Sequence, residues 1–262
     1  MFDWVYSAPL GVAALTMAVI FVGFTWVGSI FVAPILRVFV RSRAGTNGIV
    51  GNILSSFGVL YGILLGLTAV AAYQNWSDVQ SIVVDEAGAL LAVYTDLSSF
   101  PEPVRSELNA AIVDIVETTM SVEWDRLSEG DVFVGTAGKV ADLRSQLITF
   151  EPSGGTEVLV HGQAIAHFNE FVEHRRHRVY SATAGIPAVF WYVVIIGAAI
   201  NVMLVWLLDM RLVSQFFLGG LLSFYLGAII LLIARLDQPF RSVDGVSPQA
   251  FEALYRVMTS SG

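Results

Sequence analysis

The sequence predicts an all-α membrane protein, with four transmembrane helices and a helical-bundle insert between helices two and three. The 262-residue chain is 55% hydrophobic and only 14% charged. Its apolar residues are concentrated in four stretches that contain no charged residue, at positions 4–36, 44–77, 179–208 and 212–234. Each stretch is longer than the ~20 residues that a helix needs to cross a bilayer. A long acidic segment separates the second stretch from the third, and it forms the insert.

We expect four regions along the chain. Residues 1–76 hold transmembrane helices 1 and 2, and residues 77–181 form the soluble insert. Residues 182–236 hold transmembrane helices 3 and 4, and residues 237–262 form a C-terminal tail. Basic residues flank the spans on both sides and leave the orientation open: Arg37, Arg41, Arg43 and Arg211 on one side, and Arg175, Arg176, Arg178, Arg235 and Arg241 on the other.

The sequence of the insert predicts a bundle of helices. Apolar residues continue at three- and four-residue intervals after Trp76, so the second helix should run on to about Phe100, where Pro101 and Pro103 follow. An amphipathic run over 104–130, a shorter one around 140–147 and a last helix from about Thr156 complete the bundle.

The composition of the chain excludes several classes of function. Residues 78–178 hold 17 acidic and 7 basic residues, so the insert carries a net charge of −10 and does not suit nucleic acid. The chain has no cysteine, and no catalytic set can be assembled from its residues. We therefore expect no enzyme activity, no cofactor and no metal.

The second helix has an unusual row of glycines. Gly58, Gly62 and Gly66 lie four residues apart, although each glycine costs a helix roughly 1 kcal/mol relative to alanine. Small residues let membrane helices approach closely. The fourth helix repeats the pattern at Gly219, Ser223 and Gly227, and we expect it to pack on the second.

The face beside these glycines is polar at both ends and aliphatic in the middle. Such a profile is typical of a pore helix with a hydrophobic constriction. The predicted pore-lining residues are Asn52, Ser56, Val59, Ile63, Val70 and Gln74. Equally, these polar side chains could hydrogen-bond a neighbouring helix. The four uncharged stretches contain no ionisable Asp, Glu, Lys, Arg or His, which disfavours a proton pump or ion-coupled transporter.

A histidine-containing face precedes the third span. His167, Glu170, His174 and His177 share one side of a helix, where they could hold a divalent metal, respond to pH or contact lipid headgroups. Three arginines at 175, 176 and 178 argue against the metal.

Several short motifs resemble bestrophins. Ala72, Tyr73 and Trp76 are similar to the stretch through which the pore helix of bacterial bestrophins leaves the membrane, and "ARLDQPFRSVDG" resembles the segment after their last span. The whole chain resembles a bacterial family of unassigned function with a bestrophin-like domain. The motifs that carry this likeness are Glu86–Ala87, Glu123–Trp124 and an arginine-rich start of the third helix.

This resemblance implies a homo-oligomeric ion channel of the bacterial inner membrane, pentameric if bestrophins are the guide. Its partners would be membrane lipids, permeant inorganic ions and further copies of itself, with insert and termini in the cytoplasm. Bestrophins are mostly associated with anions, whereas an acidic vestibule at Asp78, Asp85 and Glu86 would favour cations. The alternative function is a membrane sensor or scaffold whose insert binds a partner.

Overall fold

The computed structural model describes residues 4–39, 46–131 and 135–260, and the regular elements of these residues are all helices. Arg41 and Arg43 lie outside the described residues. Four of the described helices are long and apolar enough to cross a membrane, so the predicted fold class is confirmed. The chain divides into two compact units.

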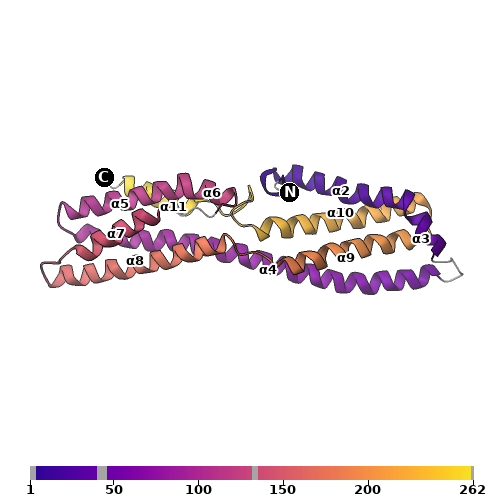
Figure 1. The fold of residues 1–262 in the computed structure, drawn as a ribbon, viewed down its shortest axis with the longest axis horizontal. Coiled ribbons are helices and arrows are strands. Elements are labelled where there is room, and N and C mark those ends of the chain that lie inside the picture. Colours follow the sequence, from indigo (N-terminus) through magenta and orange to yellow (C-terminus); the bar gives the residue numbers. More distant parts are fainter. Residues whose placement is uncertain (1–3, 40–45, 132–134, 261–262) are drawn as a thin grey trace. The chain divides into compact units, whose positions relative to one another are not determined.

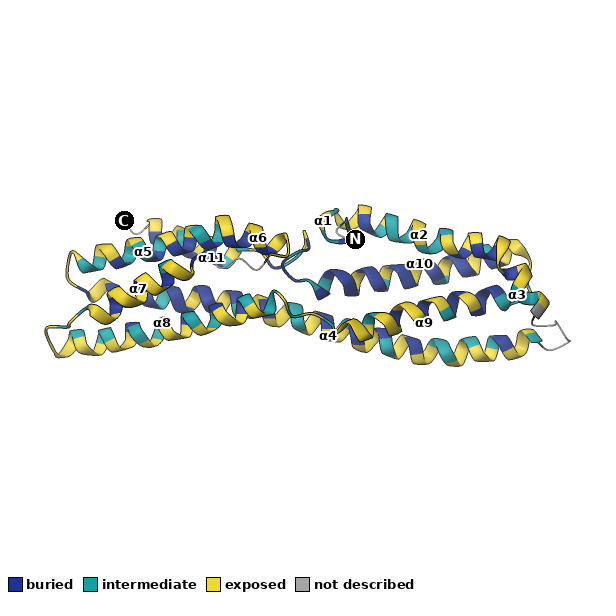
Figure 2. Ribbon diagram, in the orientation of Figure 1, coloured by how far each residue is buried: buried dark blue, intermediate teal, exposed yellow. Residues whose placement is uncertain are grey.

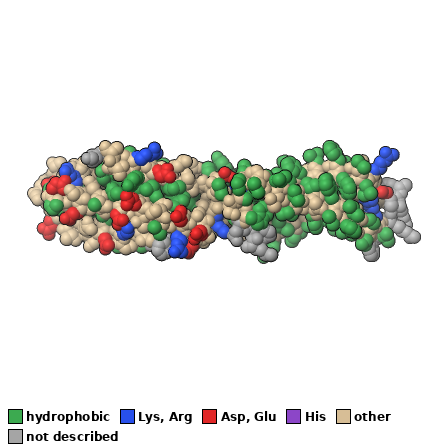
Figure 3. Space-filling model, turned by 90° about the horizontal axis from the view of Figure 1, so that it is seen from above, with side chains coloured by type: hydrophobic (Ala, Val, Ile, Leu, Met, Phe, Trp, Pro, Cys, Tyr) green, Lys and Arg blue, Asp and Glu red, His purple; other side chains and the backbone are tan. Residues whose placement is uncertain are grey.

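The first unit comprises Met1–Asn75 and Gly185–Asp237, and its helices run side by side in Figure 1. On the face drawn in Figure 3, hydrophobic side chains cover this unit, as a bilayer requires. The charge-free residues 46–75 are the membrane-spanning part of the long helix α4. The helices of the unit are α1 (Trp4–Ser7), α2 (Leu10–Phe31), α3 (Ala33–Phe39), the first part of α4 (Thr46–Asp96), α9 (Ala188–Leu207) and α10 (Leu212–Asp237).

Helix α10 packs against α2 through its small residues. A Cβ atom at Gly219 would lie 3.2 Å from the Thr25 side chain, and one at Gly227 would lie 3.3 Å from the Phe21 ring. The Ser223 and Thr25 hydroxyls are 2.5 Å apart in a buried hydrogen bond. The small residues of α10 thus face α2, whose side chains fill the space that the glycines leave, and α10 contacts the second span through other residues.

Helix α4 packs on α9 and α10 through a face that does not include Gly58, Gly62 and Gly66. Tyr61, Leu65 and Ala72 join a buried cluster with residues of α9 and α10, among them Val194 and Ile230. The Tyr61 hydroxyl donates to the Val194 carbonyl at 2.7 Å, and its ring lies where a Cβ at Gly197 would be. Gly197 is thus the glycine that lets α4 approach α9.

The second unit comprises Trp76–Ala184 and Gln238–Gly262. Its core is an apolar cluster that includes Leu90, Leu108, Ile112 and Phe168. Figure 2 shows these buried residues as stripes along the helices, with exposed residues on the outer sides. Its elements are the second part of α4, η1 (Leu97–Ser99), α5 (Val104–Thr118), the π-helical turn η2 (Thr119–Glu123), α6 (Trp124–Ser128), α7 (Ala137–Thr149), α8 (Gly155–Ser181) and α11 (Gln249–Ser260).

The C-terminal segment is part of this second unit rather than a separate tail. Helix α11 buries Phe251, Leu254 and Met258, whose spacing places them on one side of the helix. The Trp124 indole donates to the Val246 carbonyl at 3.3 Å and packs edge-to-face on Phe251. Burial of this apolar stripe explains why the segment docks.

Asp237, at the end of α10, also differs from a solvated tail carboxylate. It is 6% exposed. Its carboxylate accepts the backbone N–H of Ile186 at 2.5 Å and the indole N–H of Trp191 at 3.2 Å. It therefore fixes the segment that leads into α9.

Candidate functional site

The predicted pore-lining residues form one exposed face of α4. Asn52, Ser56, Val59, Ile63, Val70 and Gln74 are all exposed in the single chain. Tyr61, Leu65 and Ala72 are buried residues of the same span, and they pack on α9 and α10. At about 100° per residue, the exposed face lies opposite the packed one. Figure 2 shows this exposed side along the outer edge of α4.

The glycines of α4 have no neighbour among the described residues. A Cβ atom at Gly58, Gly62 or Gly66 would meet nothing within 4 Å. This contrasts with Gly28 and Gly197, where a Cβ would collide with the rings of Trp206 and Tyr61. Within the described part of the chain, the small face of α4 thus has no packing role.

Amide and hydroxyl side chains are exposed at several positions of α4, whereas most of those on the other spans are buried. Thr25, Ser29, Asn201, Gln215 and Ser223 are buried on α2, α9 and α10, and Ser214 at the start of α10 is exposed. Asn52, Ser55, Ser56 and Gln74 of α4 are exposed. Lipid cannot satisfy amide and hydroxyl groups, so such groups normally face protein or water. This face of α4 is therefore suited to contact with water or another polypeptide.

Beyond the span, α4 exposes only negative charge. Asp78 and Asp85 are exposed, and α4 contains no lysine, arginine or histidine. The third predicted vestibule residue, Glu86, is fully buried. Its assignment to an acidic surface was wrong, because Glu86 lies on the core side of the helix, where Arg178 neutralises it.

Glu86 belongs to a buried network of four charged side chains. Arg178 donates to Glu86 through Nε at 2.5 Å and through Nη2 at 3.1 Å, and the same Nη2 reaches Glu123 Oε2 at 2.9 Å. Arg175 Nη2 donates to the other oxygen of Glu123 at 2.8 Å. Thr136 donates to this oxygen through its backbone N–H at 2.8 Å and through its hydroxyl at 2.7 Å.

Aromatic rings complete the surroundings of Arg178. The guanidinium carbon lies 5.7 Å from the centre of the Trp124 ring and 5.9 Å from that of Phe251, which are cation–π distances. The network therefore connects α4, η2, the residue before α7, α8 and α11. Such a set of buried charges is stable only while it stays complete.

The two carboxyl groups differ in proton affinity. Burial raises the pKa of the Glu86 carboxyl, and Arg178 only partly opposes this. Burial also acts to raise the pKa of Glu123, but the charges of Arg178 and Arg175 and the bonds from Thr136 hold it below its ordinary value. The pKa values of the two carboxyl groups are therefore shifted in opposite directions.

Comparison with known proteins identifies the family. The Bestrophin-like domain matches residues 22–251 of this chain. The chain belongs to the bestrophin-like family. A crystal structure described as that of a membrane protein has the same fold, with a TM-score of 0.62, over 93% of this chain and 97% of that chain, at 14% sequence identity. No curated protein matches the chain.

The structure of this bestrophin-like protein brings its three sequence landmarks together. Glu86, Glu123 and the arginines before the third span, which are far apart in the sequence, meet in the buried network. Spacing in the sequence indicates that these residues are buried, but not which of them pair. Glu86 falls in the apolar stripe Val79, Val83, Leu90, and Arg175 and Arg178 continue the stripe of Phe168 and Phe171.

The histidine face of α8 does not converge on one point. His167 Nδ1 lies 2.8 Å from Asp96 Oδ2, and His177 Nε2 lies 3.0 Å from Glu173 Oε1. A helix rises about 1.5 Å per residue, so His167 and His177 are about 15 Å apart along α8. Among the described residues, no group of three His, Asp or Glu side chains could hold a metal ion.

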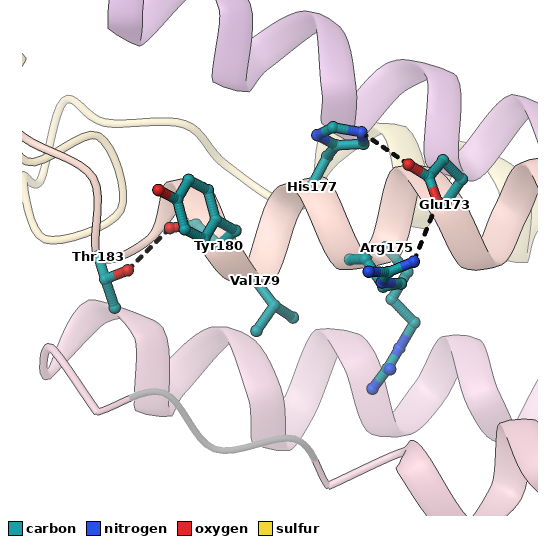
Figure 4. A pocket seen from close by; sticks show the side chains of 7 residues that line it. Glu173, Arg175, His177, Val179, Tyr180 and Thr183 are labelled. Carbon is teal, nitrogen blue, oxygen red and sulfur yellow. Dashed lines mark hydrogen bonds and ion pairs between the residues drawn. The ribbon is translucent and has the colours of Figure 1, made fainter.

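A pocket of about 610 Å³ lies along the last turns of α8, and Figure 4 shows its lining side chains. Arg176 and His177 both approach Glu173 at one edge, and Arg175 points away from them on the other side of the helix. Tyr180 and Thr183 form the end of the pocket nearest the third span.

Proposed function

We propose that this membrane protein is an ion channel subunit that assembles into a homo-oligomer, with α4 of each copy lining the pore. The observation that supports this most is the exposed face of α4, polar at Asn52 and Gln74 and aliphatic at Val59 and Ile63. This face lies opposite the side that packs on the chain's own spans. A symmetric ring of copies would turn it toward the axis.

The adjacent glycine face would form the contact between copies. Gly58, Gly62 and Gly66 leave room within 4 Å for a neighbouring helix. Close approach through small residues is how membrane helices associate. Bestrophins, which the chain resembles, imply a ring of five copies. In such a ring Val59, Ile63 and Val70 would form a hydrophobic constriction.

The charges beyond the span favour cations. Asp78 and Asp85 are exposed on the helix that carries the pore face, and Arg178 pairs with Glu86. Since α4 has no basic residue, a ring of copies would present only negative charge along it. This departs from the anion selectivity that the resemblance to bestrophins implies. We place the second unit and both termini in the cytoplasm of a bacterial cell.

Reversal potentials in planar bilayers test this function. The purified protein, under a potassium chloride gradient, should give discrete currents that reverse near the potassium potential. The double variant Asp78→Asn/Asp85→Asn should shift the reversal potential toward zero, while Asp142→Asn, an exposed carboxylate on α7, should not.

Other outcomes would change the assignment. Reversal near the chloride potential would support a channel with the selectivity of bestrophins. Silence of an intact oligomer at several pH values would favour a sensor or scaffold, whose second unit binds a partner.

A further inference from the structure

The pocket along the end of α8 combines cationic side chains and hydroxyl groups. Its volume of about 610 Å³ falls within the usual range of small-ligand sites. Arg175, Arg176, His177, Tyr180 and Thr183 contribute to its wall. We propose that this pocket binds a phosphate ester, and its position in the chain favours the headgroup of an anionic phospholipid as the source.

Arg176 is the central cation of this pocket. Its side chain is 76% exposed, and its Nη1 lies 3.4 Å from Glu173 Oε2. That distance is longer than the roughly 2.7–2.9 Å of a strong charge-assisted bond. The remaining guanidinium donors therefore stay available, and phosphate is the group that suits their planar arrangement.

The Tyr180 hydroxyl extends the donor set toward the membrane. Tyr180 is 74% exposed, and its hydroxyl can donate to a phosphate oxygen. The Thr183 hydroxyl donates to the Tyr180 carbonyl at 2.9 Å, which fixes its position at the end of the pocket. His177 shares Glu173 with Arg176.

Arg175 links the pocket to the buried network. It is 8% exposed, and its Nη2 bonds to Glu123 and Thr136. Its guanidinium points away from Arg176 and His177, so Arg175 contributes to the wall of the pocket and not to the donor set for phosphate. Since Glu123 also binds Arg178, and Arg178 binds Glu86, the pocket is linked by direct contacts to α4.

The chain places this pocket close to the bilayer surface. Thr183 precedes Ala188, where the third span begins, by a short non-helical segment. Exposed tyrosines are common at membrane interfaces, and anionic headgroups attract arginines next to a span. This proposal does not depend on ion conduction.

Lipid-dependent thermal unfolding of the full-length protein in detergent tests the proposal. Phosphatidylglycerol should raise the unfolding midpoint more than phosphatidylcholine, because binding to the folded state stabilises it. Arg176→Gln should raise the apparent dissociation constant for phosphatidylglycerol about tenfold, as expected for the loss of a charge-assisted contact. Tyr180→Phe should weaken binding less. Arg144→Gln, an exposed arginine on α7, is the matched control and should change nothing.

Inorganic phosphate distinguishes the two possible sources. Stabilisation by phosphatidylglycerol alone identifies a lipid site, and equal stabilisation by inorganic phosphate identifies a site for free phosphate esters. Equal effects of phosphatidylglycerol and phosphatidylcholine, without an effect of phosphate, would overturn the proposal. An unchanged dissociation constant in Arg176→Gln, folded as judged by its lipid-free midpoint, would overturn it as well.

Discussion

Arg178 donates to Glu86 and Glu123 from a fully buried position, and each of the two carboxylates is almost completely shielded from water. The free energy of such a pair depends on its completeness, since an unpaired buried charge has neither water nor a counter-ion. Glu123 retains Arg175 as a second partner, whereas Glu86 has only Arg178 in direct contact among the described charged groups.

Arg178→Met should therefore destabilise the protein by about 3–5 kcal/mol, the range for breaking a buried ion pair. The double variant Arg178→Met/Glu86→Leu should recover much of this loss, because it removes both charges and leaves Glu123 with Arg175. Thermal or denaturant unfolding of the purified protein measures both variants. A double variant no more stable than the single one would contradict the pairing described here.

The opposite pKa directions of the two glutamates predict opposite pH trends. The pKa of Glu86 is raised by burial, so its stabilising contribution is lost as pH rises from the ordinary glutamate pKa through the raised one. In that window, Glu86→Gln should become more stable relative to wild type as pH increases.

Glu123 should behave in the opposite way. Burial acts to raise its pKa but two arginines hold it low, so its contribution is present above the ordinary pKa and is lost as pH falls through the lowered one. Glu123→Gln should be least stable relative to wild type near neutral pH. Unfolding midpoints between about pH 4 and pH 8 measure both trends. Parallel trends in the two variants would refute this account of the network.

The position of Glu86 was also predicted wrongly from the sequence. Asp85 and Glu86 are adjacent acids of α4 beyond the predicted pore-lining face, and both were assigned to a surface. One step along a helix turns a side chain by about 100°, which places Asp85 in solvent and Glu86 in the core. The spacing from Val83 and Leu90 places Glu86 on the buried side of the helix. Burial of an acid can be inferred only when its basic partner, here Arg178, is known.

At the scale of elements, glycines that look alike in the sequence have different roles. Gly197 accepts the Tyr61 ring, so Gly197→Ala should destabilise the first unit, by about 1–3 kcal/mol for overpacking. Gly62 has free space beside it, so Gly62→Leu should leave the subunit folded and dissociate the oligomer. Light scattering during size-exclusion chromatography measures the mass in detergent.

Gly11 provides a matched control for added volume. It lies on α2, is exposed, and also has nothing within 4 Å of a Cβ. Gly11→Leu should leave the oligomer intact, since α2 has an apolar outer surface. If Gly62→Leu keeps the mass of the wild type, the glycine face does not join copies.

Helix positions were largely predictable because their signals are local. Absence of charge marked the spans, and Pro101 and Pro103 marked the end of the long helix, which passes into η1 after Asp96. Pairing of helices was not predictable in the same way. Both α4 and α10 carry small residues, and only the bulky partners on α2 decide which of the two faces is covered. Helix α11 was missed because its apolar stripe is short.

In the whole molecule, we expect the exposed face of α4 to contact water in the assembled channel. The aliphatic middle of this face should limit conduction by excluding water. Ile63→Ser should then increase the conductance of single channels, because a hydroxyl makes the constriction easier to wet. An unchanged conductance would place the constriction elsewhere.

Family membership and the shared fold establish the architecture. In the proposed channel, the permeant ion and the number of copies would depend on the surfaces that the single chain leaves uncovered. The single chain leaves the polar face of α4 uncovered, and its exposed groups are where function must be tested.

Cysteine accessibility is the most direct measurement, because the natural chain contains no cysteine. Ile63→Cys and Gln74→Cys should each lose current when a water-soluble, positively charged thiol reagent is added during bilayer recording. Ile196→Cys, on the exposed apolar side of α9, should keep its current. We expect the reagent to block the current of both α4 variants and to leave the current of the α9 variant unchanged. Unmodified current in both α4 variants would contradict the claim that this face lines the pore.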